Sequence, residues 1–265
     1  MSDIKPLEDM ESDRLKLLLH GRPGTGKTAT GSTIAQRCKL LYIDLPGEKG
    51  IKTIKHTPYR KNILVARPKT IERISELFWD VQTGEIKVDA VMIESLSALQ
   101  KMYIRYILGN DEQEVKKVER NPKVLDQQGW GKVLDFMTDQ VVFWYNLADA
   151  ERDDPKHVIF TSQSKVVEDD ETGEEEVTVD VSRGSQAIAL AAPDYVGYTF
   201  IEEGESEALD EEPPMNFCVR FGPHPVIRTK MREDVDTEKP LPAVLGRNGS
   251  RVTVPKICKR LEIPL

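Results

Sequence analysis

The stretch GRPGTGKT, residues 21–28, follows the apolar run LKLLLH and sets the expectation for the whole chain. It fits the pattern G-x-x-x-x-G-K-[ST], with Lys27 and Thr28 in the last two positions. Glycine lets the backbone turn with positive φ, so successive N–H groups in such a loop can point inward at an anion. The pattern therefore predicts a phosphate-binding loop, which requires a strand before it and a helix after it.

A chance glycine-rich turn is the alternative explanation for this stretch. The flanking residues argue against it, because the preceding run reads as a short buried strand. Residues 27–39, KTATGSTIAQRCK, read as a helix with Ile34 and Cys38 on one face, and Gly31 weakens this helix only mildly. We therefore expect nucleotide binding through this loop in an α/β protein.

The expected cofactors are ATP and Mg²⁺. Lys27 would reach the β- and γ-phosphates, and the Thr28 hydroxyl would take a position on Mg²⁺. The positive end of the following helix would add to the anion site. The residues expected to contact the nucleotide are Gly21, Arg22, Pro23, Gly24, Thr25, Gly26, Lys27, Thr28 and Ala29.

The overall composition narrows the class of protein. Of the 265 residues, 39% are hydrophobic and 31% are charged, which is typical of a polar, soluble globular protein. No stretch approaches the roughly 20 apolar residues of a membrane span. The acidic N-terminus lacks the apolar core of a signal peptide, and the cysteines and histidines are too scattered for disulfides or a zinc site. We expect a cytoplasmic protein that does not contact a membrane.

Charge is distributed unevenly along the chain. The net charge of −8 argues against a simple basic protein that coats nucleic acid. From residue 213 to residue 265, ten Lys and Arg stand against five Asp and Glu, a local charge of +5 that leaves −13 for residues 1–212. Residues 167–180 and 202–212 are strongly acidic, and solvated faces are the simplest explanation for them.

Short apolar runs alternate with amphipathic segments through the first part of the chain. This alternation predicts a mainly parallel sheet covered by helices on both faces. The period-two pattern of residues 165–181 predicts a hairpin around residues 171–173, and later strands predict an antiparallel C-terminal side.

We expect an N-terminal tail (1–13), an ATPase core (14–240) and a basic C-terminal appendage (241–265). The expected strands are residues 14–20, 39–44, 62–66, 88–95, 157–163, 194–203, 216–221 and 225–230, and the expected helices after the loop helix are 70–84, 96–109 and 131–150.

The strand VMIES supplies the acid that a Mg²⁺ site requires, because it ends in Glu94. We expect this strand to lie beside the strand that precedes the phosphate loop, with Glu94 and Thr28 on the same ion. Asp is usual at this position, and the longer Glu leaves two alternatives open, contact with the metal through water or service as a base. A purely structural carboxylate is a further alternative, although burying one unpaired is costly.

Hydrolysis also requires groups that hold the attacking water and sense the γ-phosphate. Gln163 ends the strand IFTSQ, and the carboxyl ends of parallel strands meet at one edge of a sheet. Asp44 and Glu48 follow the second strand and are the candidate bases. A solvated loop charge is the alternative for each of them.

The blocks GRPGTGKT, LYIDLPGEKG, VDAVMIES, VIFTSQ and VIRTKMR occur in this order over residues 14–232. In this the chain resembles the RecA-like core of bacteriophage ATP-binding proteins, a nucleotide-binding AAA family that includes single-strand annealing and recombination ATPases. The resemblance implies a RecA-like P-loop NTPase fold, with a mainly parallel sheet flanked by helices and antiparallel strands at the C-terminal side. It also implies ATP hydrolysis coupled to single-stranded DNA, in a ring or filament of identical subunits in the cytoplasm of a host cell.

The same resemblance implies roles for individual residues. An acid after the second strand, here Asp44 or Glu48, would act as the base, and Gln163 would couple the γ-phosphate to DNA-binding loops. Basic residues from a neighbouring subunit would complete the site, and they correspond to Arg228, Lys230 and Arg232. These three fall on one face if VIRTKMR is a strand, for which a solvated, charged edge strand is the alternative.

Single-stranded DNA is the expected partner, with a single-strand binding protein as a further candidate. The predicted hairpin carries eight acids between Glu168 and Asp180, which would repel phosphate. Contacts with DNA are therefore expected at the base of the hairpin and in the basic C-terminal segment. The residues concerned are Lys165, Arg183, Arg247, Arg251, Lys256, Lys259 and Arg260.

Two other classes of protein stay open. A AAA+ loader or remodelling motor with a protein partner fits the loop equally well, although VMIES lacks the double-acid ending of such motors and no small helical lid domain follows the core. A small-molecule kinase would act as a monomer and would need an acceptor site, for which the sequence gives no candidate.

Overall fold

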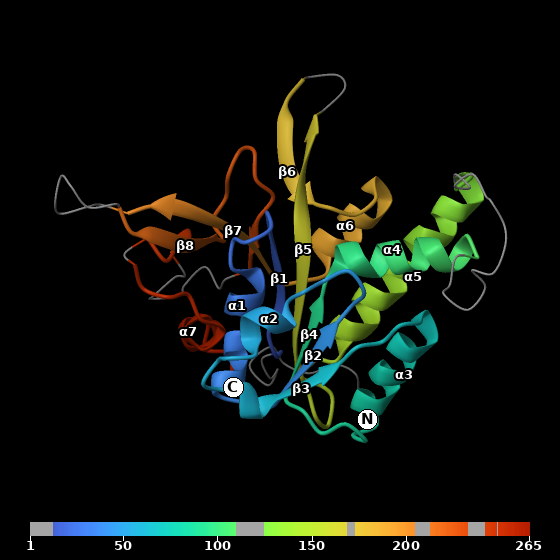
Figure 1. Ribbon diagram of the computed structural model, residues 1–265, viewed down its shortest axis with the longest axis horizontal. Coiled ribbons are helices and arrows are strands. Elements are labelled where there is room, and N and C mark those ends of the chain that lie inside the picture. The colour runs from blue at the N-terminus through green and yellow to red at the C-terminus, as the bar shows by residue number, and fades with distance from the viewer. Residues whose placement is uncertain (1–12, 110–124, 169–172, 205–212, 233–241, 248) are drawn as a thin grey trace, which may run out of the picture.

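The computed structural model describes residues 13–109, 125–168, 173–204, 213–232, 242–247 and 249–265. In this part of the chain, one ten-stranded sheet has the order β10-β8-β7-β1-β5-β4-β2-β3, with β6 paired to β5 and β9 paired to β7 (Figure 1). The strands are β1 (Lys16–Gly21), β2 (Leu40–Asp44), β3 (Ile63–Ala66), β4 (Ala90–Glu94), β5 (His157–Glu168), β6 (Glu175–Val179), β7 (Tyr195–Glu203), β8 (Met215–Arg220), β9 (Lys230–Met231) and β10 (Val244–Leu245).

The six strands from β7 to β3 are parallel, and β8, β9 and β10 add antiparallel pairs at the C-terminal side. The α/β class with a mainly parallel sheet and antiparallel C-terminal strands is thereby confirmed. The helices are α1 (Lys27–Gly31), η2 (Ser32–Gln36), α2 (Ile51–Ile54), η3 (Arg60–Asn62), α3 (Ile71–Gln82), α4 (Leu96–Ile107), α5 (Gln127–Asn146), α6 (Arg183–Ala191) and α7 (Val254–Arg260), where η marks a 3₁₀ helix.

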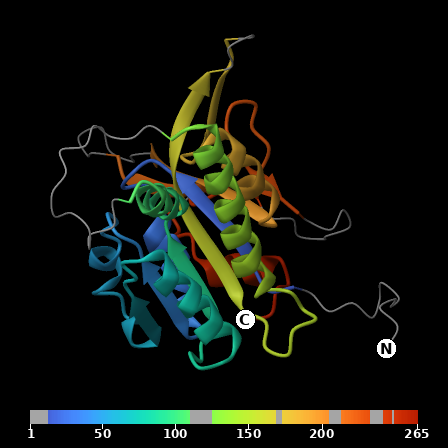
Figure 2. The ribbon, with the colours of Figure 1, turned by 90° about the vertical axis from the view of Figure 1, so that its right-hand side faces the viewer.

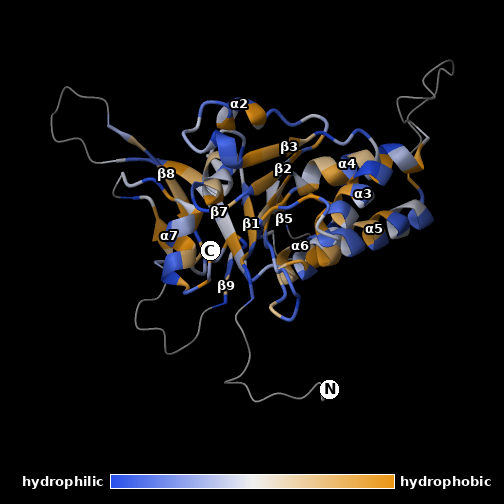
Figure 3. Ribbon diagram, turned by 90° about the horizontal axis from the view of Figure 1, so that it is seen from below, coloured by the Kyte–Doolittle hydropathy of each residue, from blue (hydrophilic) through white to orange (hydrophobic). Residues whose placement is uncertain are grey.

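The sheet lies between two helical layers, as Figures 2 and 3 show. Side chains alternate along each strand, so Leu18 joins the core beneath α3, α4, α5 and α6, while Leu17 and Leu19 join the core beneath η2 and α7. Both cores consist of buried apolar side chains. Burial of about 25 cal/mol per Å² of apolar surface is the main force that holds these layers together.

The order of the strands corrects one expectation. The strand that ends in Glu94 does not lie beside β1, because β5 lies between them, with Gly21 paired to Gln163. Strand order in a parallel sheet depends on how the crossover helices pack, which the spacing of strands along the chain does not determine. As a result, Gln163 is the direct neighbour of the phosphate loop.

The helix expected over residues 27–39 begins at Lys27 and becomes a 3₁₀ helix after Gly31. The Ser32 and Thr33 hydroxyls donate hydrogen bonds to carbonyl oxygens three residues earlier. Such bonds compete with the α-helical pattern. The expected helix is therefore divided into α1 and η2.

The described part of the C-terminal segment belongs to the core, whereas an appendage was expected. β10 pairs with β8, and α7 packs against η2. Val254, Ile257 and Cys258 are fully buried in the core beneath α7, and the Val254 amide donates to Thr33 Oγ1 at 2.8 Å. The seven residues of α7 are too few for a clear helical periodicity in the sequence.

Two further expectations concern the hairpin and the last strand. The hairpin is confirmed, since β5 and β6 pair antiparallel and project beyond the sheet (Figure 1). Its expected turn lies mostly outside the described residues. Residues 110–122, a polar stretch that the sequence predicts to be a loop or a frayed helix end, also lie outside them. The strand expected over residues 225–230 is present only as the two residues of β9. None of the described helices is both long enough and apolar enough to span a membrane.

Candidate functional site

The loop of residues 21–28 connects β1 to α1 at the carboxyl edge of the sheet. Gly24 and Gly26 have φ values of 82° and 92°, which only glycine adopts without strain. The loop is braced from β7, because Thr25 Oγ1 lies 2.6 Å from Thr199 Oγ1. The backbone geometry that the sequence pattern requires is therefore present.

Lys27 lies inside this loop and is 5% exposed. Its ammonium donates to the carbonyl oxygens of Gly21 and Arg22 at 2.8 and 2.9 Å, and to Gln163 Oε1 at 3.4 Å. Burial lowers the pKa of Lys27, while the carboxylates of Glu94 and Glu48 act in the opposite direction. A buried cation held by loop carbonyls is well placed to exchange them for phosphate oxygens.

Glu94 ends β4 and is 5% exposed. Thr28 Oγ1 donates to its Oε1 at 2.6 Å, and the Tyr42 hydroxyl donates to its Oε2 at 2.9 Å. Burial raises the pKa of Glu94, and the charge of Glu48 adds to this effect, whereas the two hydrogen bonds lower it. Thr28 and Glu94, which the sequence predicts to lie on the same ion, are therefore in direct contact.

The donor set at this point fits Mg²⁺. The ion prefers hard oxygen ligands and is usually held by one or two protein oxygens together with waters and substrate phosphates. Thr28 and Glu94 present a hydroxyl and a carboxylate oxygen side by side, and the buried carboxylate needs a compensating positive charge. Among the described residues, no cluster of three or more His, Cys, Asp or Glu forms a separate metal site.

The two candidate bases lie in different environments. Asp44 is 7% exposed at the end of β2, and its Oδ2 accepts from Arg67 Nε at 3.1 Å. Its other oxygen, Oδ1, has no hydrogen-bond partner among the described residues. Burial raises the pKa of Asp44, and Arg67 opposes this. Glu48 is half-buried in the next loop and accepts from Ser95 Oγ at 2.7 Å.

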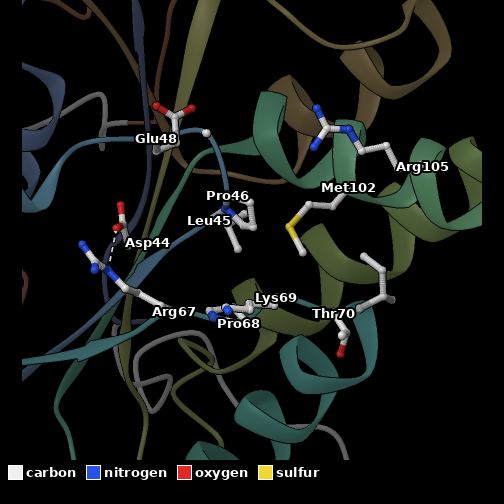
Figure 4. Close-up of a pocket in the computed structure, with 12 residues that line it drawn as sticks. Asp44, Leu45, Pro46, Glu48, Arg67, Pro68, Lys69, Thr70, Met102 and Arg105 are labelled. Carbon is white, nitrogen blue, oxygen red and sulfur yellow. Dashed lines mark hydrogen bonds and ion pairs between the residues drawn. The ribbon is translucent and has the colours of Figure 1, made fainter. Parts of the chain in front are cut away.

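Both carboxylates line a pocket of about 350 Å³ outside the ends of β2 and β3. Figure 4 shows three cations, Arg67, Lys69 and Arg105, around the same space. We call this the charged pocket. It borders the Lys27 site through Glu48, whose charge acts on the pKa values of both Lys27 and Glu94.

The backbone of Gln163 is held in place, because its main-chain N–H donates to Ser97 Oγ at 3.2 Å. Its side-chain oxygen faces Lys27. Glu94 ends β4, whereas Gln163 lies within the neighbouring strand β5, at the last residue that pairs with β1. The expectation that this strand ends at Gln163 is wrong, because β5 continues to Glu168 and pairs there with β6. The structure brings the loop, Lys27, Thr28, Glu94, Gln163 and Glu48 together, with Asp44 in the adjoining charged pocket.

Sequence reasoning missed Tyr42 and Gly50. Tyr42 shares a strand face with Asp44, so the period of two was the available signal for it. Gly50 packs so closely over the site that an added Cβ would lie 2.0 Å from the Tyr42 hydroxyl and 2.9 Å from Glu94 Oε2. A loop glycine gives no sequence signal for such a close approach.

The basic residues expected to act on a neighbouring subunit all have partners within this chain. Arg228 pairs with Glu176, and Arg232 pairs with Asp194. The Lys230 ammonium donates to three carbonyl oxygens at the end of α6, those of Leu190, Ala191 and Pro193. Only Lys230 lies in a strand, so the expected alternation on one face is not formed.

The residues expected to bind DNA fall into two groups on different sides of the molecule (Figure 1). Lys165 lies on β5 and Arg183 begins α6, at the base of the hairpin. The second group lies in and before α7, where Arg247 pairs with Glu202. Its other members are Arg251, Lys256, Lys259 and Arg260, all exposed.

Sequence and structure comparisons relate this chain to known proteins. The sequence model of the AAA domain family matches residues 13–240. No match was found among curated proteins. Among solved structures, the flagellar accessory protein FlaH from Methanocaldococcus jannaschii is similar over 78% of each chain, with 14% sequence identity and a TM-score of 0.38. Because the family match covers most of its length, this chain belongs to the AAA domain family.

Proposed function

We propose that the protein binds and hydrolyses ATP in a Mg²⁺-dependent reaction at the phosphate loop. The observation that carries this proposal is the buried contact set of Lys27, Gln163, Thr28 and Glu94 at the carboxyl edge of the sheet. These side chains come from the start of α1, the end of β4 and the middle of β5, which are far apart in the sequence. Membership of the AAA domain family supports the same activity.

The residues divide the work of hydrolysis. Lys27 holds the β- and γ-phosphates, and Gln163, in contact with it, reports the presence of the γ-phosphate. Thr28 and Glu94 hold Mg²⁺, which when bound neutralises charge on the phosphate oxygens. Tyr42 fixes the orientation of the Glu94 carboxylate by donating to its second oxygen.

Glu48 is the general base in this proposal. Its charge acts on both Lys27 and Glu94, so it lies close to the expected γ-phosphate, and Ser95 orients it. Asp44 is instead buried and paired with Arg67. A half-buried carboxylate with one oriented oxygen is better placed to take a proton from water.

Single-stranded DNA is the polymer on which this activity would act, in recombination or annealing. Support comes from the resemblance in the sequence and from exposed basic residues, Arg183 at the base of the hairpin and the group around α7. Lys165 is half-buried, and its ammonium donates to the Val181 carbonyl oxygen. The test is the rate of ATP hydrolysis with and without single-stranded oligonucleotide, read beside the mass in solution with ATP. Stimulation by the oligonucleotide supports the proposal, and binding that falls steeply with salt would identify phosphate contacts.

A ring or filament of identical subunits would complete the site. Mixing Lys27→Ala subunits with Arg232→Ala subunits should then restore activity, because one mixed interface regains both groups. If the mixture is as inactive as each variant alone, in particles shown to contain both variants, the role of Arg232 in the neighbouring site is contradicted. Arg232 must leave Asp194 to act in this way, so a change of that pair on assembly is also expected.

The AAA domain match favours a second candidate, a loader or remodelling ATPase with a protein partner. The same measurements separate the two. If oligonucleotides neither bind at low salt nor change the rate of hydrolysis, the protein-partner motor becomes the better conclusion.

A further inference from the structure

A second space of about 350 Å³ borders the phosphate loop on the side opposite the charged pocket. Gly26, Ala29 and Thr30 form one wall, just beside Lys27 and Thr28. Met215, Asn216 and Phe217 of β8 form a second wall, and Gly246 with residues 249–252 forms the third. We call this space the β8 hollow.

The β8 hollow has an apolar floor. Met215 and Phe217 are 57% and 52% exposed, whereas Asn216 between them is 6% exposed. The usual arrangement of a strand is thus inverted, with the apolar side chains toward the open space and the polar one inside. Phe217 lies against the loop itself, because a Cβ on Gly26 would be 3.3 Å from its Cδ1.

The C-terminal segment is held in place as a wall of this hollow. Asn216 Nδ2 donates to the Arg247 carbonyl at 3.0 Å, which explains why this amide is buried. Gly246 has a φ of 97°, and an added Cβ would lie 2.5 Å from the Phe217 carbonyl oxygen, so only glycine permits this approach. Val252 is buried beyond it, and exposed Arg251 lines the opening.

We propose that the β8 hollow binds the nucleoside part of a purine nucleotide, with the base stacked on Phe217 and Met215. The inference rests on the proposed function, which places the phosphates at the loop and so directs the nucleoside toward Ala29. An aromatic face favours the flat ring of a base. Arg251 adds a cation that suits the ring face or the ribose side of the ligand. The C-terminal wall lies outside the family match of residues 13–240, so the proposed nucleoside site includes residues beyond that match.

Calorimetric titration with ATP and with inorganic tripolyphosphate tests this inference. Phe217→Ala should weaken ATP binding about tenfold, the cost of one lost stacking contact, and leave tripolyphosphate binding unchanged. Phe143→Ala is the matched control, since Phe143 on α5 is a comparably exposed phenylalanine at 47% and lies away from the hollow. It should change neither affinity.

A second variant, Phe217→Trp, gives a direct signal. Its fluorescence should change when ATP binds and stay constant when tripolyphosphate binds. Unchanged ATP affinity in Phe217→Ala, together with a silent Phe217→Trp, would overturn the nucleoside site while leaving ATP binding at the loop intact. If the wild-type protein binds neither ligand, the proposed function fails as well.

Discussion

The charged pocket and the β8 hollow lie on opposite sides of the same loop and differ in chemistry. The charged pocket lies outside parallel strands β2 and β3 and gathers Asp44, Glu48 and three cations. The β8 hollow lies against the antiparallel side of the sheet and presents Met215 and Phe217. From this comparison we expect hydrolysis and nucleoside recognition to depend on different sides of the loop. Changes near the charged pocket should alter turnover more than affinity, and changes in the hollow should do the reverse.

The largest effect is expected from Lys27→Ala, which acts on both sides of this comparison. Removal of the cation among the phosphates should lower the rate of hydrolysis by about a thousandfold or more. The fold should survive, because the variant removes a buried charge whose pKa burial already lowers. Steady-state kinetics and thermal melting check this, with the exposed Lys52→Ala as the control. Turnover at the wild-type rate would end the assignment of the site.

The next largest effect separates the two candidate bases. Glu48→Gln should lower kcat about a hundredfold with little change in KM, which is the usual scale for a lost general base. Asp44→Asn should lower kcat less than about tenfold, because Asp44 is already engaged by Arg67. Measurement of kcat and KM for the two variants under the same conditions shows which carboxylate is the base. The opposite ranking would assign the base to Asp44.

Glu94→Gln should separate catalysis from stability. Turnover should fall far more than nucleotide affinity, since the role of the metal side grows in the transition state. Without nucleotide, the melting temperature should rise by about 2–4 °C, the scale for 1 kcal/mol in a domain of this size. An unchanged or lower melting temperature would mean that the buried carboxylate is fully compensated by Thr28 and Tyr42.

The same variant predicts a dependence on pH. Burial raises the pKa of Glu94 in the folded protein above its unfolded value, so the ionised form opposes folding. The stabilising contribution of the protonated Glu94 side chain is fully present below the unfolded pKa. It is lost as the pH rises through the folded pKa. The advantage of Glu94→Gln over the wild type should therefore be largest above that raised pKa and shrink on acidification. Melting curves at several pH values, with both proteins side by side, measure this.

The smallest effect is expected far from both spaces, at Lys230. Lys230→Ala should cost about 1 kcal/mol of unfolding free energy, because three carbonyl oxygens near the end of α6 lose their ammonium donor. Hydrolysis should be unchanged if this role is purely structural. A large loss of activity with a normal melting temperature would instead support a role in a neighbouring subunit.

Local signals explain what the sequence predicted well. The phosphate loop and helix α3, which Thr70 caps, each depend on a few adjacent residues, and both are present where the sequence predicts them. The position of β5 between β1 and β4 depends on packing between distant segments, so the prediction that the strand of Glu94 lies beside β1 was wrong. The same reason hid Tyr42 and Gly50, whose contacts join separate loops. For the C-terminal segment, the sequence analysis considered only the charge, although apolar residues hold the segment to the core.

The packing of α7 bears on how the protein can be produced. The family match ends at residue 240, which invites expression of residues 13–240 as a minimal domain. Such a fragment would lack β10 and α7, and it would expose the side of η2 against which α7 packs, where Ile257 and Cys258 belong to the same buried core as Ile34. Apolar surface uncovered in this way favours aggregation over folding. The boundary that sequence comparison recognises is therefore not a boundary at which the chain can be cut.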